Sequence, residues 1–230
     1  MSVDRTEVAE SARPHRVAAM TVRERIGYRC LRLVIEIWCR VFWRMTVIGR
    51  DRLPTAGPFI LSPSHRSNID FLVTGAAIPR AMRFMAKDSL WSAGWSGRFL
   101  VHMGAFPVNR DRTDRRALRN CSESLAHGDP VVLFPEGRRK AGLVIEDLQE
   151  GPAWVACRAR VPIVPVGLGL TDRAMPIGAK FVRPVKLTVV IGEPIYPDVP
   201  ASGRIPRGAV ADLTEQLRDE VQHCFDLSRR

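Results

Sequence analysis

A histidine and an aspartate lie at a spacing that suits proton transfer. In the stretch SPSHRSNIDF, residues 62–71, His65 precedes Asp70 by five positions, where one apolar run stops and an apolar helix-like run begins. A neutral imidazole can accept a proton from an attacking hydroxyl, while a carboxylate on its other nitrogen fixes the tautomer and stabilises the imidazolium. The pair therefore predicts a catalytic base and its orienting carboxylate. The alternative interpretation is an ordinary loop histidine near a helix-start aspartate.

The elements that would position this pair alternate along the chain. Apolar runs predict strands at 58–62, 82–86, 104–108, 130–135, 161–168 and 185–192. Helical patterns lie between and after them, at 68–78, 89–101, 113–127, 151–160 and 207–227. This alternation predicts an α/β fold with a mostly parallel central sheet flanked by helices.

Length and composition indicate one folded domain. At 230 residues with 46% hydrophobic residues, the chain is long enough to bury one substantial core. We expect a flexible tail at 1–20, a basic amphipathic helix at 21–50 and the main domain at 51–230. The five cysteines are scattered without metal-ligand spacing, which favours a reducing compartment and predicts no metal site.

Polar residues follow several of the predicted strands. His65 follows the first, Arg110 follows GAFPV, and Glu136 with Gly137 follows PVVLFP. In parallel sheets, ligands bind at the loops that leave the strand ends, so these residues are expected to converge. A glycine after the strand permits the positive φ of a tight turn.

The net charge of +11 is concentrated in two segments. Residues 1–50 hold ten Lys or Arg against five Asp or Glu, and residues 80–119 hold nine against three. A basic surface of this kind suits nucleic acid, anionic lipid or a phosphorylated substrate.

The basic segment at 21–50 favours lipid over nucleic acid. Its charged residues recur every three or four positions in one helical stripe, and they are Arg25, Arg29, Arg32, Glu36, Arg40 and Arg44. The other faces are apolar, but charges interrupt the run too often for a helix of about 20 apolar residues that spans a membrane. We expect the helix to lie on an anionic membrane surface. The alternative is a helix that packs on the protein's own core.

Four blocks in order resemble a known family. HRSNID, GAFPVNR, FPEGRR and VPIVPV are similar to the motifs of the glycerolipid acyltransferases typified by 1-acylglycerol-3-phosphate acyltransferase. The resemblance covers about residues 55–170. It implies transfer of an acyl group from acyl-CoA or acyl-carrier protein to the hydroxyl of a lysophospholipid, giving phosphatidate from 1-acylglycerol-3-phosphate. It also implies no metal or other cofactor, and a peripheral or monotopic place on the cytoplasmic face of the membrane.

The resemblance also implies roles for residues around the pair. Arg110 and Arg139 would grip the acceptor's phosphate with forked donors, and Glu136 would hold its glycerol hydroxyls beside the Gly137 turn. Lys87 matches a basic position near the family's active site.

Several alternatives stay open at this stage. The acceptor could be another lysophospholipid or a glycolipid, or the chain could be a lipid-surface binding protein with a degenerate site. Ser62 and Ser64 could indicate a serine hydrolase, although GWSGR at 94–98 departs from the Gly-x-Ser-x-Gly pattern. The third block departs from the family's FPEGTRS, since Arg138 and Lys140 replace small hydroxyl residues. These two cations could face the site or the membrane.

Overall fold

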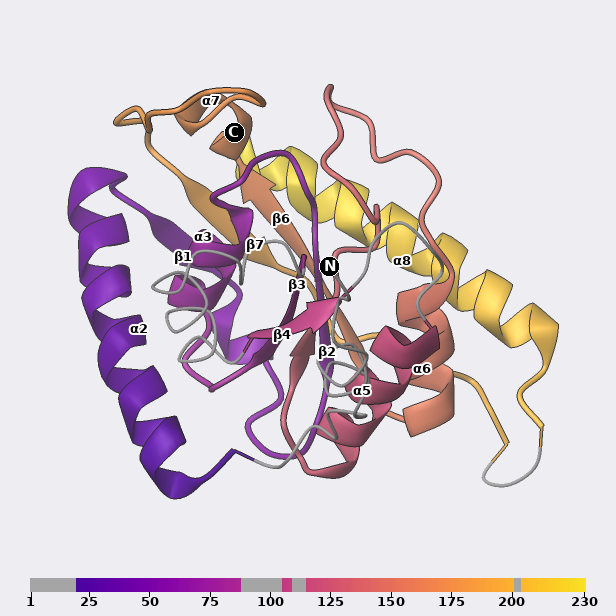
Figure 1. Ribbon diagram of the computed structural model, residues 1–230. Helices are drawn as coiled ribbons and strands as arrows, with labels where there is room; N and C mark the ends of the chain where they lie inside the picture. Colours follow the sequence, from indigo (N-terminus) through magenta and orange to yellow (C-terminus); the bar gives the residue numbers. More distant parts are fainter. Residues whose placement is uncertain (1–19, 88–104, 109–114, 201–203) are drawn as a thin grey trace, which may run out of the picture.

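The computed structural model describes residues 20–87, 105–108, 115–200 and 204–230. Its centre is a seven-stranded sheet in the order β1-β7-β6-β2-β5-β3-β4 (Figure 1). The strands are β1 (Thr46–Ile48), β2 (Ile60–Pro63), β3 (Arg83–Lys87), β4 (Ala105–Val108), β5 (Val131–Val132), β6 (Ile163–Gly169) and β7 (Thr188–Ile191). All neighbours are parallel except β6 and β7, so the edge pair β7 and β1 runs against the rest. The predicted α/β fold with a mostly parallel sheet is confirmed.

Helices cover both faces of the sheet (Figure 1). One face carries α2 (Val22–Phe42) and α3 (Asp70–Ala77), and the other carries α5 (Arg115–Ala126), α6 (Gly151–Ala159) and α8 (Arg207–Ser228). A single turn, α7 (Thr171–Ala174), follows β6. Neighbouring strand residues point to opposite faces, so Ile60 joins the core under α8 while Leu61 joins the core under α2 and α3. The result is a three-layer arrangement with two apolar cores.

Most predicted elements correspond to observed ones, with small changes at their ends. The strand predicted at 130–135 is much shorter, because only Val131 and Val132 pair with neighbours before the chain turns. The helix predicted at 89–101 lies outside the described residues, as does nearly all of the tail at 1–20.

The N-terminal helix ends earlier than the segment 21–50 assigned to it. Thr21 and Glu24 form a capping box at its start, and the helix stops at Phe42. Arg44 then adopts a left-handed conformation with φ 46°, which redirects the chain. Thr46–Ile48 continue as the edge strand β1, in parallel register with Thr188–Val190. Residues 46–48 therefore form a strand because of a long-range pairing that helical periodicity cannot reveal.

Part of the charged stripe of α2 pairs with protein carboxylates, while Arg29, Arg40 and Arg44 stay exposed. Arg25 pairs with Asp129, a fully buried residue at the far end of the sheet, at 2.5 Å. Glu36 is buried and forms ion pairs with Arg32, Arg40 and Arg50. The expected basic face is thus partly neutralised inside the protein.

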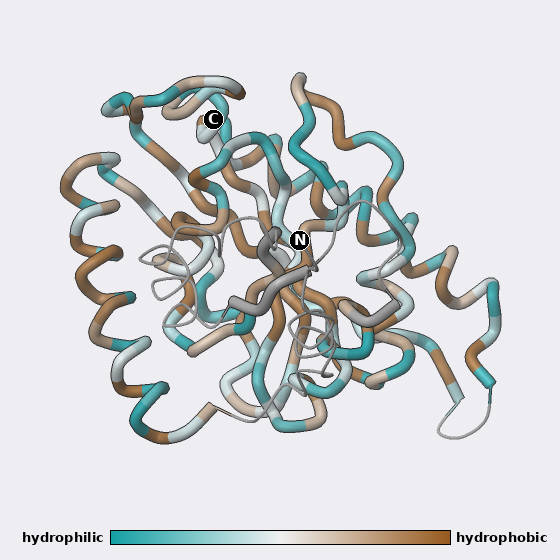
Figure 2. Tube along the Cα trace, in the orientation of Figure 1, coloured by the Kyte–Doolittle hydropathy of each residue, from teal (hydrophilic) through white to brown (hydrophobic). Residues whose placement is uncertain are grey.

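The outward face of α2 is largely apolar, although Arg23, Arg29 and Arg40 are exposed as well. Its exposed large hydrophobic side chains are Val22, Ile26, Leu33, Val34, Ile37, Trp38 and Val41. Figure 2 shows hydrophobic positions recurring along this helix between hydrophilic ones. In the part of the chain that the structure describes, no helix has the length and hydrophobicity needed to cross a bilayer. The helix therefore packs on the core with one face and presents an uncovered apolar stripe with the other.

Candidate active site

The end of β2 places His65 at the carboxyl edge of the parallel strands. The Ser64 N–H donates to the carbonyl of Val166 on β6, and the Ser64 hydroxyl accepts from the Leu168 N–H at 3.0 Å. Ser64 is fully buried. Its hydroxyl therefore holds the strand end in place, and the geometry gives no support to a serine nucleophile at this position.

His65 and Asp70 form the contact expected of a catalytic dyad. The His65 Nδ1 lies 2.9 Å from the Asp70 Oδ2, and the Asp70 side chain has no exposed surface. Because Asp70 is an acceptor when ionised, Nδ1 carries the proton in the neutral ring and Nε2 is the free base. The His65 side chain retains 10% exposure. Within the described residues, Nε2 has no hydrogen-bond partner, so it is available to a substrate hydroxyl.

Backbone donors hold Asp70 in place. Its Oδ2 also accepts from the N–H of Arg66 at 2.6 Å and of Ser67 at 2.7 Å, just before α3 begins. The Ser67 hydroxyl donates to the Met175 carbonyl at 2.7 Å, which ties this loop to the segment after α7. The spacing of five residues lets one carboxylate oxygen bind the imidazole and two backbone amides at once. The dyad is therefore fixed before a substrate arrives.

Arg66, which the sequence analysis did not single out, lies directly behind the dyad. It is only 1% exposed and forms an ion pair with the Oε2 of Glu136. Its guanidinium also donates to the carbonyls of His65, Gly142 and Val144 and lies 5.0 Å from the centre of the Phe225 ring on α8. The only signal for it in the sequence was an arginine directly after His65, inside the loop that also carries Asp70.

Glu136 faces protein groups on both of its oxygens. Oε1 accepts from the His65 N–H at 2.8 Å, and Oε2 binds Arg66. The side chain has no exposed surface. The contact of Glu136 with glycerol hydroxyls stays a prediction. In the structure, Glu136 binds the backbone N–H of His65 while Arg66 binds the His65 carbonyl, so the two side chains together hold the backbone of His65.

The turn that carries Glu136 closes tightly. Gly137 has φ 68°, as predicted, and its N–H donates to the Phe134 carbonyl. A Cβ at this glycine would lie 3.2 Å from the Cγ of Gln149. The Phe134 ring stacks on the His65 imidazole, with centroids 4.2 Å apart and an interplanar angle of 29°. The FPEG turn thus forms one wall of the dyad.

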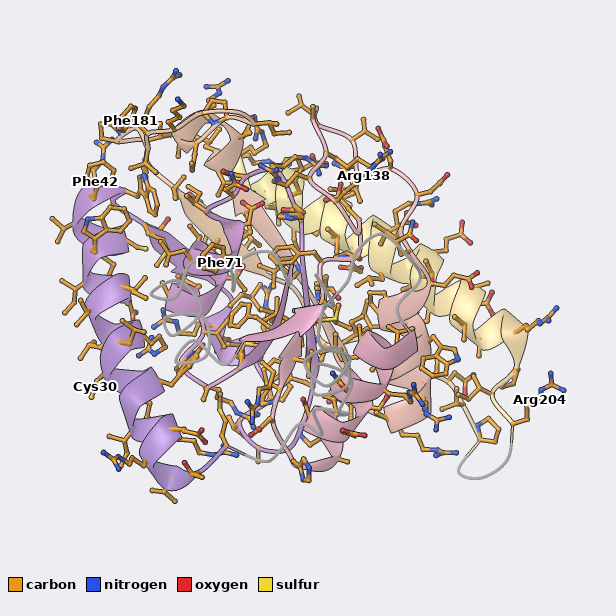
Figure 3. The ribbon with its side chains drawn as sticks, viewed as in Figure 1. Cys30, Phe42, Phe71, Arg138, Phe181 and Arg204 are labelled. Atoms are coloured by element: carbon orange, nitrogen blue, oxygen red, sulfur yellow. The ribbon has the colours of Figure 1, made fainter. Side chains whose placement is uncertain are left out.

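The proposed phosphate-binding residues are described in part. Arg139 follows the turn and is partly exposed, whereas Arg138 is exposed (Figure 3). The Lys140 side chain forms an ion pair with Glu146, and the backbone N–H of Lys140 donates to the His65 carbonyl at 3.0 Å. Arg110 lies outside the described residues, and Lys87 ends β3 in register with Val108. The structure therefore brings His65, Asp70, Glu136, Gly137 and Arg139 to one region.

Metal chemistry has no ligand set in the described ranges. No three His, Cys, Asp or Glu side chains come together there in a way that could hold an ion.

Known proteins share both the sequence and the fold of this chain. A sequence model of the family described as Acyltransferase matches residues 44–169. The 1-acyl-sn-glycerol-3-phosphate acyltransferase of Bacillus subtilis is 26% identical over 181 residues, covering 76% of this chain and 85% of the relative. A protein of the same name from Chlamydomonas reinhardtii is 30% identical over 195 residues, and these span 78% of this chain but only 58% of the relative.

A solved structure has the same architecture. The crystal structure of the 1-acyl-sn-glycerophosphate (LPA) acyltransferase PlsC from Thermotoga maritima matches with a TM-score of 0.68 at 22% identity, over 88% of this chain and 84% of that one. The four motif blocks and the dyad all lie within the matched residues 44–169. The resemblance inferred from those blocks is confirmed, and the chain belongs to the acyltransferase family.

Proposed function

We propose that this protein transfers an acyl group from an acyl thioester to the free hydroxyl of a lysophospholipid, with 1-acylglycerol-3-phosphate as the acceptor. The observation that carries the proposal is the His65–Asp70 contact at 2.9 Å, with Nε2 left free. The names of the relatives support 1-acylglycerol-3-phosphate as the acceptor. Arg139, whose forked donors suit a phosphate, comes two residues after Gly137 in the turn that packs on His65. The donor is acyl-CoA or acyl-carrier protein.

The chemistry follows from the dyad. His65 Nε2 takes the proton of the acceptor hydroxyl as its oxygen attacks the thioester carbonyl carbon. Asp70 stabilises the imidazolium that forms. Collapse of the tetrahedral intermediate breaks the carbon–sulfur bond, and the proton passes from His65 to the departing thiolate. No acyl-enzyme is required, because the acceptor oxygen is itself the nucleophile.

Exposed apolar side chains surround the dyad, as expected for an enzyme that binds a membrane surface. The two loops bonded to residues 65–67 carry exposed apolar side chains at their tips, which are Leu143, Val144, Ile177 and Phe181. Phe181 lies at the same end of the molecule as Phe42, the last residue of α2 (Figure 3). Together with the apolar stripe of α2, these residues support peripheral membrane binding through apolar contact first and charge second. The cytoplasmic face is the side that we propose.

A panel of acceptors tests the reaction. The assay offers radiolabelled acyl-CoA and radiolabelled acyl-carrier protein as donors, and we expect acyl transfer from at least one of them. Lysophosphatidate should be preferred as acceptor over neutral lysolipids and glycolipids. Asp70→Asn is the matched control, because it keeps the shape of the side chain but spoils the orientation of the imidazole. A pure protein that transfers nothing to any lysolipid would support the degenerate binding protein instead. Preference for another acceptor would overturn the assignment of lysophosphatidate.

Membrane binding is tested on the apolar stripe. Ile37→Ser with Val41→Ser changes two exposed positions of α2 and leaves the buried face intact. We expect it to weaken flotation with vesicles, including neutral ones, because apolar contact is lost. Flotation equal to that of the unchanged protein would exclude α2 as the membrane contact.

A further inference from the structure

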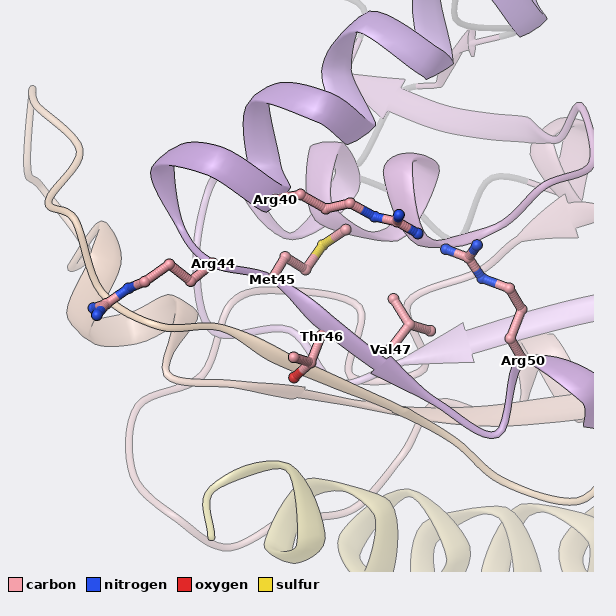
Figure 4. A pocket seen from close by; sticks show the side chains of 6 residues that line it. All are labelled: Arg40, Arg44, Met45, Thr46, Val47 and Arg50. Carbon is pink, nitrogen blue, oxygen red and sulfur yellow. The ribbon is translucent and has the colours of Figure 1, made fainter.

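A basic hollow lies at the far edge of the sheet, where α2 turns into β1 (Figure 4). It has a volume of about 560 Å³, and its lining residues are Arg40, Arg44, Met45, Thr46, Val47 and Arg50. Strands β7 and β6 separate β1 from β2, and His65 follows β2. The hollow therefore belongs to a different part of the surface from the dyad and from the FPEG turn.

The charges in this hollow do not balance. Arg40 and Arg50 share one carboxylate oxygen, the Glu36 Oε1, at 2.7 and 3.0 Å, while Arg32 binds the other oxygen. Figure 4 shows the Arg40 and Arg50 guanidinium groups directed toward each other. One carboxylate thus serves three guanidinium groups, which leaves an excess of positive charge before Arg44 is counted.

The arrangement holds its cations in fixed positions. Burial raises the pKa of Glu36, but hydrogen bonds from Arg50 and Arg32 outweigh it and hold that pKa below the ordinary value. Glu36 therefore stays ionised and anchors Arg40 and Arg50 side by side. Arg44 is exposed, and Figure 4 shows its side chain directed away from Arg40 and Arg50, so it adds to the positive charge at the rim of the hollow. Its left-handed backbone, at φ 46°, is an uncommon conformation for a residue with a side chain.

We propose that the hollow binds the phosphate group of an anionic phospholipid. Guanidinium groups offer forked donors that match phosphate oxygens, and a bound phosphate would offset the charge that Glu36 leaves uncompensated. The lipid source is favoured because Ile37 precedes Arg40 by three residues and so adjoins it on the helix surface, which places the hollow beside the apolar stripe of α2. This assignment rests on the proposed placement of α2 at the membrane.

A lipid that is monomeric in solution tests the site without a bilayer. Dihexanoylphosphatidylglycerol below its micellar concentration is titrated into the full chain by calorimetry. We expect saturable binding that Arg40→Gln with Arg50→Gln weakens at least about tenfold, because the two guanidinium groups that face each other both lose their charge-assisted contact with the phosphate. The control, Arg23→Gln with Arg29→Gln, removes the same charge from exposed positions of α2 and should leave binding nearly unchanged.

The other outcomes overturn the proposal in distinct ways. Equal weakening in both double variants would show only general charge attraction, and absence of saturable binding would show no site. Equal binding of zwitterionic dihexanoylphosphatidylcholine would assign the contact to the acyl chains. Inorganic phosphate that binds as tightly as the lipid would assign the hollow to a free anion. No bilayer is present in this titration, so its results do not depend on the flotation experiment. A protein whose α2 does not bind vesicles could therefore still bind the monomeric lipid, and the two proposals fail independently.

Discussion

Removal of the Arg66 guanidinium should destabilise the whole fold as well as the dyad. Arg66→Met leaves the Glu136 carboxylate buried with one remaining donor, the His65 N–H, and releases three backbone carbonyls. Breaking a buried ion pair from one side costs about 3–5 kcal/mol, out of a total stability of about 5–15 kcal/mol. With a urea m-value of about 3 kcal/mol per molar, the unfolding midpoint should fall by about 1–1.7 M.

The pairing itself is measured by a double-mutant cycle. Glu136→Met alone should cost about as much as Arg66→Met, because it leaves the guanidinium buried without its carboxylate. The double variant should cost clearly less than the sum, since both charges are gone and the main residual cost is the unpaired His65 N–H, at about 1–3 kcal/mol. Urea denaturation followed by circular dichroism gives all four stabilities.

The control for this cycle is Arg218→Met, whose ion pairs with Glu215 and Asp219 lie on the surface of α8. Its unfolding midpoint should hardly move. Additive effects of the two buried substitutions, or single variants as stable as the unchanged protein, would refute the argument that this pair supports the loop of His65.

Three further predictions follow from single positions. Gly137→Ala should cost about 1–2 kcal/mol in urea denaturation, because φ 68° is left-handed and the new Cβ meets Gln149; an unchanged midpoint would contradict this. Glu36→Gln should destabilise the protein most above about pH 4.5, where the carboxylate is charged in the folded and the unfolded state. The difference in unfolding free energy between the two proteins should shrink as pH falls through the lowered pKa of the folded state. A difference that grows toward low pH would have the wrong sign. Arg138→Thr should leave relative catalytic efficiencies across acceptors unchanged, because its side chain is exposed, and a selective loss for the most anionic acceptor would place it in the site.

Much of this architecture could be predicted from local patterns. Apolar runs such as 161–168 and the alternation with helices predict the parallel strands, since those strands are buried on both faces. His65 and Asp70 could be found because five residues of one loop place them together. Those features depend on residues that are neighbours in the sequence.

The features that were missed depend on contacts between distant residues. Thr46–Ile48 forms a strand beside residues 188–190. Its three β-branched residues favour a strand, but the run is too short to stand out against the helical spacing of the charges before it. Arg66 and Glu136 are 70 positions apart, so their ion pair has no local pattern. The side chains of Arg25, Arg32 and Arg40 on α2 point toward two carboxylates, Asp129 and Glu36, and Asp129 lies 104 positions from Arg25 in the sequence. Periodicity predicts which residues share a face, and the tertiary fold decides which face is covered.

The most direct test of the account is acyl transfer by His65→Ala. The substitution removes the base while the Asp70 contacts to the Arg66 and Ser67 amides stay in place, so the loop should keep its shape. Turnover with lysophosphatidate and the preferred thioester should fall by about 10² to 10⁴-fold, with the circular dichroism spectrum and the urea midpoint close to those of the unchanged protein. Near-normal turnover by that folded variant would contradict the assignment of His65 as the catalytic base.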